Sequence, residues 1–153
     1  MGLKALKGIA YGLLGTFVSR NNDIDGYWGL GVLRLFAETN GMTTITLDLL
    51  NQGPEQFVDS PIRIANRIYQ RWLATALEKS RIDRSQVAHA SISIRFSTFD
   101  EFPNAVRDTR GEPYKCTVTI VHVDRREYSA SKVGVCAPHD PKKDQRSRIL
   151  KEV

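Results

Sequence analysis

The chain has 153 residues, of which 41% are apolar and 25% are charged, and its net charge is +5. This composition excludes a disordered chain and a low-complexity fibre, and the length favours one compact domain. Residues 141–153 carry five basic and two acidic side chains, which is the greater part of the excess positive charge. We therefore expect a single α+β domain over 1–140 and a basic C-terminal tail over 141–153.

An apolar run over 8–18 follows Lys4 and Lys7 and has the proportions of a secretory signal. No pair of small residues typical of a cleavage site follows the run, and a membrane span needs about 20 apolar residues. We therefore expect this run to be a core strand, and we expect a cytoplasmic protein without a membrane partner.

Residues 7–50 are expected to form three antiparallel strands, because turn-forming residues at 21–26 and 39–41 separate the apolar runs. The Asn40-Gly41 pair is the stronger turn signal, since both residues tolerate the positive φ of a tight hairpin. The first two strands would be apolar on both faces and would need cover on both. Their glycines favour curvature or a ligand-facing surface. These glycines are Gly8, Gly12, Gly15, Gly26, Gly29 and Gly31.

The second half of the chain begins with a helix, because Ser60-Pro61 is typical of a helix N-terminus. This amphipathic helix is expected over about 61–80. Strands are expected at 88–96, where apolar and polar residues alternate, and at 114–124 and 128–136, which are rich in β-branched residues.

The predicted fold class is α+β, a mainly antiparallel sheet of about six strands in βββ-α-βββ order with one long amphipathic helix packed on it. A small β-barrel plugged by the helix is the alternative, because a barrel would also cover strands that are apolar on both faces.

His122 and Asp124, at the end of an expected strand, are the candidate catalytic residues. A histidine titrates near neutral pH, and a nearby carboxylate can orient it for acid–base chemistry. No nucleophile motif accompanies the pair, so the sequence leaves open whether the protein is an enzyme. We expect no cofactor and no metal, because the cysteines and histidines match no zinc-site spacing. The residues weighed as ligands are Cys116, His122, Cys136 and His139.

A ligand-binding surface is the second candidate site, since aromatic and glycine residues are adjacent in the expected second strand. Its residues are Tyr27, Trp28, Gly29, Gly31 and Arg34.

The helix provides the third candidate site. Arg63, Arg67 and Arg71 recur at i,i+4 spacing opposite its apolar face, and they predict an anionic partner or acidic residues of another subunit. Nucleic acid is the less favoured partner, because no aromatic platform for bases is present and residues 1–140 have a net charge of only +2.

The leading functional hypothesis is a small binding or assembly module without identifiable catalytic chemistry. It would form a homo-oligomer through its glycine-rich hydrophobic β-hairpin. One alternative is a small-molecule-binding barrel or enzyme that uses a glycine-rich, aromatic-lined pocket with His122 and Asp124 as the acid–base pair. The other is weak nucleic-acid binding through the arginine row.

Overall fold

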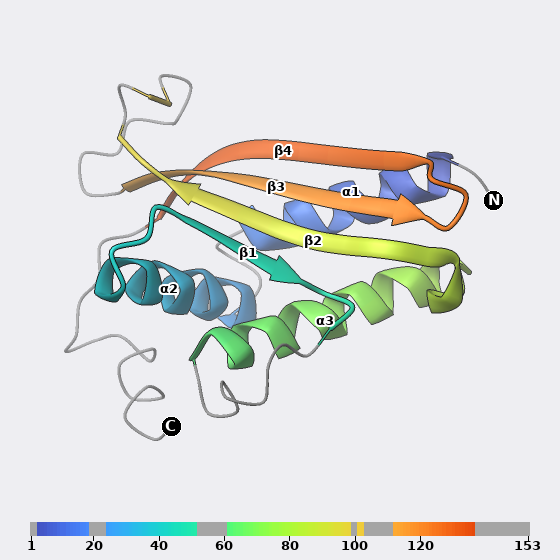
Figure 1. Ribbon diagram of the computed structural model, residues 1–153, viewed down its shortest axis with the longest axis horizontal. Coiled ribbons are helices and arrows are strands. Elements are labelled where there is room, and N and C mark those ends of the chain that lie inside the picture. Colours follow the sequence, from blue (N-terminus) through green and yellow to red (C-terminus); the bar gives the residue numbers. More distant parts are fainter. Residues whose placement is uncertain (1–2, 19–23, 52–60, 99–100, 103–111, 137–153) are drawn as a thin grey trace.

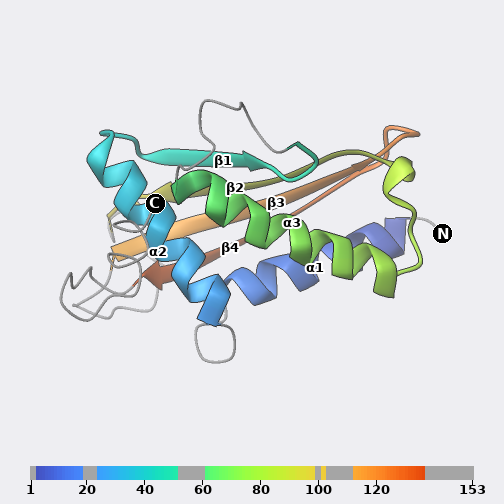
Figure 2. The same ribbon diagram turned by 90° about the horizontal axis from the view of Figure 1, so that it is seen from below.

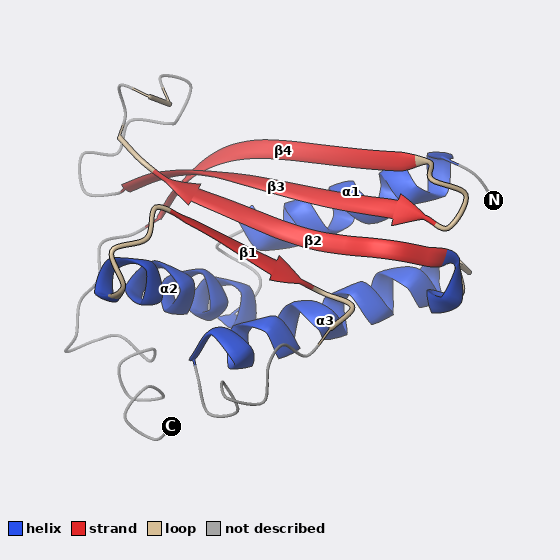
Figure 3. Cartoon of the chain, in the orientation of Figure 1, coloured by secondary structure: helices blue, strands red, loops and turns tan. Residues whose placement is uncertain are grey.

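The computed structural model of the chain describes residues 3–18, 24–51, 61–98, 101–102 and 112–136. Three helices lie on one face of a four-stranded sheet (Figures 1 and 2). Figure 3 shows that two helices come first, followed by one strand and the third helix, and that the other strands of the sheet come after α3. The elements are α1 (Leu3–Val18), α2 (Ile24–Thr39), β1 (Thr44–Asp48), α3 (Pro61–Lys79), a 3₁₀ turn (Arg84–Gln86), β2 (Val87–Phe96), β3 (Glu112–His122) and β4 (Glu127–Cys136).

The sheet is antiparallel throughout, with the strands in the order β1-β2-β3-β4. Its inner face is apolar, because alternate residues of each strand point toward the helices. The register aligns Leu47 with Ile92, and Ile92 with Val118, so the buried side chains form continuous rows across the sheet. One hydrophobic core therefore lies between the sheet and the helical layer. The fold is thus confirmed as α+β with an antiparallel sheet.

The prediction of a glycine-rich β-hairpin near the N-terminus is wrong. Residues 3–18 and 24–39 form α1 and α2, and β1 alone of the three expected strands is present. Buried residues of α1 recur at helical spacing, so one stripe faces the sheet while the glycines lie on the other side. The stripe is Leu6, Ile9, Ala10, Leu13 and Leu14. The composition of a continuous apolar run is compatible with a helix and with a strand. Here the run forms a helix, because its apolar stripe packs against the inner face of the sheet.

The Asn40-Gly41 pair ends a helix and does not turn a hairpin. Gly41 has a φ of +63°, the left-handed conformation that favours glycine after a helix. The backbone N–H of Met42 donates to the carbonyl of Ala37 at 2.8 Å, and the N–H of Gly41 donates to Glu38 at 3.4 Å. These two bonds are a Schellman motif, which satisfies carbonyls left open at the end of α2.

The expected sheet of about six strands, the single covering helix and the barrel alternative are also wrong. The described part of the chain contains four strands and three α-helices. Two of the expected strands are the helices α1 and α2, and the sheet stays open with β1 and β4 at its edges. The helical layer therefore includes three helices, of which α3 spans residues 61–79.

Most of the outer face of the sheet is polar and rich in hydroxyl groups, and at one end Val133 and Val135 of β4 form a small apolar cluster with Phe102. Hydroxyl oxygens of neighbouring strands approach each other at Thr46–Ser93 (3.2 Å), Thr117–Ser131 (2.8 Å) and Thr119–Ser129 (3.0 Å). The strand register places Thr46, Ser93, Thr117 and Ser131 in one row across all four strands. This face is typical of a sheet that is covered on one side only.

Replacing Gly15 with alanine should stabilise the protein by about 0.5–1 kcal/mol, because alanine loses less conformational freedom in a helix than glycine does. A Cβ at Gly15 would have no atom within 4 Å. Urea unfolding of the two proteins measures the difference. A lower midpoint for Gly15→Ala would contradict the helical assignment of this segment.

Replacing Gly134 with alanine should have the opposite effect. Gly134 pairs with Tyr114 across β3 and β4, and an added Cβ would be 2.6 Å from the tyrosine hydroxyl oxygen. Tyr114 is fully buried, so its ring has little room to move. We expect a loss of about 1–3 kcal/mol in the free energy of unfolding. An unchanged urea midpoint would show that the two strands pair in another register.

Candidate functional site

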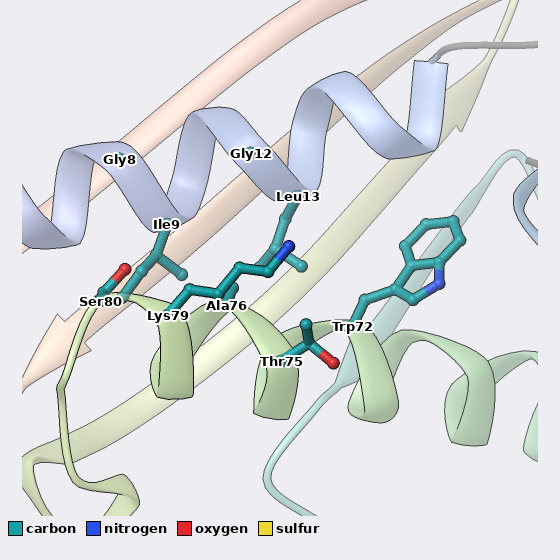
Figure 4. Close-up of a pocket in the computed structure, with 9 residues that line it drawn as sticks. All are labelled: Gly8, Ile9, Gly12, Leu13, Trp72, Thr75, Ala76, Lys79 and Ser80. Carbon is teal, nitrogen blue, oxygen red and sulfur yellow. The ribbon is translucent and has the colours of Figure 1, made fainter. Parts of the chain in front are cut away.

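A groove with a volume of about 340 Å³ lies between α1 and α3 (Figure 4). Trp72 lies toward one end of the groove and Ser80 lies toward the other. Residues of both helices line it in two facing rows. The lining residues are Gly8, Ile9, Gly12 and Leu13 from α1, and Trp72, Thr75, Ala76, Lys79 and Ser80 from α3 and the residue after it.

The groove exists because the facing positions of α1 are glycines. Gly8 and Gly12 are four residues apart and so share one flank of the helix. A Cβ at either position would have no atom within 4 Å, which means that side chains could be accommodated there. The adjacent Ile9 and Leu13 are buried and form an apolar base. The groove is thus an open channel beside a packed core.

The two helices beside the groove are basic. Together, α1 and α3 contain six basic residues and one acidic residue, Glu78, whereas α2 contains one basic and two acidic residues. Among the described residues that line the groove none is acidic, and Lys79 is the charged one. Lys79 lies in the last turn of α3, where the helix dipole favours a cation. The basic residues are Lys4, Lys7, Arg63, Arg67, Arg71 and Lys79.

The predicted arginine row lies on α3 but none of its members lines the groove. Arg67 and Arg71 are exposed, and they contribute to the positive potential outside the groove. Arg63 is partly buried, and its Nε and Nη1 atoms have no hydrogen-bond partner among the described residues. The role of the row in binding an anionic partner stays a prediction.

The predicted ligand-binding residues lie on α2 and not on a strand. Gly31 is buried, and Arg34 is partly buried with its guanidinium carbon 5.2 Å from the ring centroid of Phe96. The structure does not describe the burial of Tyr27, Trp28 and Gly29. Of the two whose burial is described, Gly31 and Arg34, neither lines the groove. Their role as ligand contacts stays a prediction.

The structure brings His122 and Asp124 together at the turn between β3 and β4. The Nδ1 atom of His122 is 2.9 Å from a carboxylate oxygen of Asp124 and accepts the Asp124 backbone N–H at 3.1 Å. Nδ1 can accept the backbone N–H only when it carries no proton, and it can donate to the carboxylate only when it carries one. The two contacts of Nδ1 therefore cannot both be hydrogen bonds in the same protonation state. Asp124 also accepts two hydrogen bonds from Arg126, from the backbone N–H at 2.9 Å and from Nε at 2.6 Å.

These contacts determine the electrostatics of the turn. The hydrogen bonds from Arg126 hold the pKa of Asp124 well below its usual range, and the carboxylate in turn raises the pKa of Arg126. Arg125 has a φ of 73°, as expected for a tight turn. The carboxylate is therefore occupied in closing the hairpin, and a catalytic role for His122 and Asp124 stays a prediction.

The candidate metal ligands lie in different environments. Cys116 is buried in the core, and burial raises the pKa of its thiol to about 12, which disfavours the thiolate that metals bind. Over the described ranges, no three His, Cys, Asp or Glu side chains converge. The side chain of Cys136 and the whole of His139 lie outside the described residues.

None of the helices described is long and apolar enough to cross a membrane.

Sequence reasoning missed the groove itself. The sequence predicts a strand for the segment that contains Gly8 and Gly12, whereas the structure places both glycines on α1 beside the groove. The spacing of four between the two glycines was the available signal. No family model, curated protein or solved structure matches this chain.

The carboxyl of Asp124 should titrate below the ordinary aspartate pKa of about 3.9. Because the folded-state pKa is lowered, this group stabilises the fold above the ordinary value and loses that effect as the pH falls through the folded-state pKa. NMR titration of the carboxyl carbon measures the shift. Arg126→Gln should return the pKa toward the ordinary value, and an unshifted pKa in both proteins would contradict the hydrogen bonding described.

Proposed function

We propose that this protein is a binding module whose groove between α1 and α3 takes an acidic, partly apolar segment of a partner protein. One observation carries the proposal. An apolar-based groove of about 340 Å³ lies between α1 and α3, two helices that together contain six basic residues and one acidic residue. A cytoplasmic location is part of the proposal and rests on the sequence.

The apolar part of the partner would lie along the base of the groove. The apolar surface open to a partner comes from Ala76 and Trp72 of α3, which are partly buried, because Ile9 and Leu13 of α1 are almost fully buried. Trp72 is a large aromatic side chain of a kind enriched in binding sites. The absence of side chains on Gly8 and Gly12 allows the backbone of a partner to approach α1 closely. An amphipathic helix seated in a hydrophobic groove is a common form of such recognition.

The acidic part of the partner would face the basic residues around the groove. Lys79 lies within it, while Arg67 and Arg71 are exposed on the same helix. Complementary charge speeds encounter and selects among partners more than it raises affinity, and salt screens it. Binding should therefore weaken as the ionic strength rises. A second copy of this chain fits the groove poorly, because its helical layer has the same sign of charge.

Nucleic acid is the competing candidate, because Arg67 and Arg71 are exposed cations on a helix. Phosphates would be neutralised by these arginines and would not need the apolar base. Trp72 is the one aromatic side chain among the described residues that line the groove, whereas binding of single strands uses successive bases stacked on aromatic side chains. The groove therefore favours a protein segment.

Fluorescence of Trp72 tests the proposal. The chain has two tryptophans, so Trp28→Phe leaves Trp72 as the sole reporter. The probe is an amphipathic helical peptide with leucines on one face and glutamates on the other, compared with the same peptide carrying lysines. We expect the glutamate peptide to shift Trp72 emission and to lose affinity with added salt, and the lysine peptide to leave the emission unchanged.

Two groove variants and one control locate the binding site. Gly12→Leu fills the groove and should weaken binding about tenfold or more, which corresponds to about 1.4 kcal/mol. Lys79→Glu should weaken it by reversing the charge within the groove. Ala74→Leu adds the same side chain as Gly12→Leu at an exposed position of α3 outside the groove, and it should have no effect. Equal affinity for Gly12→Leu and Ala74→Leu would refute the groove as the site. Binding of a DNA duplex that is lost only with Arg67→Gln and Arg71→Gln would favour nucleic acid.

A further inference from the structure

The outer edge of β4 is open within the described structure. β4 is the last strand of the sheet, with β3 on one side and no described strand on the other. It spans 10 residues, and its register with β3 runs from Glu127 to Cys136 without a shift. The other edge strand, β1, has 5 residues. Proteins usually protect a long regular edge strand by shortening it, by placing charged side chains or proline on it, by inserting a bulge or by covering it, and β4 carries such a charge at Lys132.

The register identifies the backbone groups on this edge. The N–H of His122 donates to the carbonyl of Arg126 at 2.8 Å, which closes the ladder between β3 and β4. Hydrogen-bonded pairs alternate along an antiparallel ladder, so Tyr128, Ala130, Lys132 and Gly134 are the residues bonded to β3. The N–H and C=O groups of the intervening residues point away from β3. Those residues are Glu127, Ser129, Ser131, Val133 and Val135.

We propose that this edge pairs with β4 of a second copy of the chain, in an antiparallel arrangement centred on Ser131. This inference concerns a surface distinct from the groove and does not depend on the proposed function. In this register Ser131 faces the same residue of the second copy, and Ser129 faces Val133. This pairing uses the backbone N–H and C=O groups of all five residues whose backbone groups point away from β3. The two sheets become one continuous sheet of eight strands with both helical layers on the same side.

The side chains of β4 are compatible with this pairing. Lys132 lies on the inner face, and the register places it opposite Ala130 of the second copy, so the two lysines do not face each other directly. The outer face continues the hydroxyl row, because Ser131 of one copy meets Ser131 of the other. Directly opposed like charges, which destabilise a strand pair, do not arise between the described strand residues.

A second observation points to the same edge. Tyr11 of α1 is 52% exposed, one of the large hydrophobic residues left on the described surface. Its ring centroid is 5.7 Å from that of Tyr128, which belongs to β4. Pairing two copies at β4 brings the two α1 helices to either side of the new junction. Tyr11 would then contribute apolar contact beside the backbone hydrogen bonds, as an interface core requires.

A cysteine at the centre of the predicted pair tests the register. Ser131→Cys, made with Cys136→Ser to remove the other thiol of β4, should form an intermolecular disulfide on mild oxidation. The Cα atoms of directly opposed hydrogen-bonded residues are about 5.5 Å apart, within reach of a disulfide. Thr117→Cys in the same background is the control, because Thr117 lies on the same face one strand inward. Its two copies would be about three strand spacings apart and should not cross-link.

A backbone variant tests the edge without oxidation. Ser131→Pro removes an N–H that points away from β3, so the monomer should keep its circular dichroism while light scattering shows loss of the dimer. Ser131→Ala keeps the N–H and should remain dimeric. A strictly monomeric wild-type protein, or a dimer that survives Ser131→Pro, would overturn the inference. Peptide binding to the groove should persist in the Ser131→Pro monomer, which separates this result from the proposed function.

Discussion

The burial of one stripe of α1 against β3 and β4 is the contact on which the rest of the structure depends. Leu6, Ile9 and Leu13 are each almost fully buried there, and each such side chain contributes about 1.5–3 kcal/mol of hydrophobic stabilisation. This burial offsets the cost of three glycines within one helix, which is about 1 kcal/mol apiece. It also fixes the rotation of α1 about its axis. The two flanks of the helix then acquire different surroundings, and each flank borders one of the two proposed surfaces.

The flank that carries Gly8 and Gly12 faces α3 and forms the groove. The other flank carries Tyr11, which reaches Tyr128 at the edge of the sheet. A partner in the groove and a second copy at β4 would therefore contact different residues of the same helix. Two copies joined at β4 would present two grooves, and a partner with two acidic segments would bind such a dimer with the advantage of effective concentration.

The charge distribution separates the two faces of the protein. The helical layer is basic, and the outer face of the sheet is a surface of paired hydroxyls such as Thr117 and Ser131. Hydroxyls that bond to each other have less need of an external partner, which makes the open sheet face a weaker candidate for binding than the helical layer. At the β3–β4 turn, Asp124 is likewise committed to Arg126 and to the backbone. The groups on which the two proposals depend are thus Lys79 of α3 and the backbone of β4.

The sequence by itself determined the second half of the fold and the α+β class. Alternation over 88–96 and β-branched residues over 114–124 indicate strands because a sheet covered on one side imposes a period of two. Ser60-Pro61 indicates the start of a helix because proline lacks an N–H that the first turn does not use. The first half was decided by tertiary structure. The run over 8–18 is apolar enough for either element, and only the inner face of β3 and β4 selects the helix by burying Ile9 and Leu13 together. The spacing of Gly8 and Gly12 is the one local sign of the groove, and the open edge has none, because each surface is formed by elements distant in the sequence whose positions are set by packing.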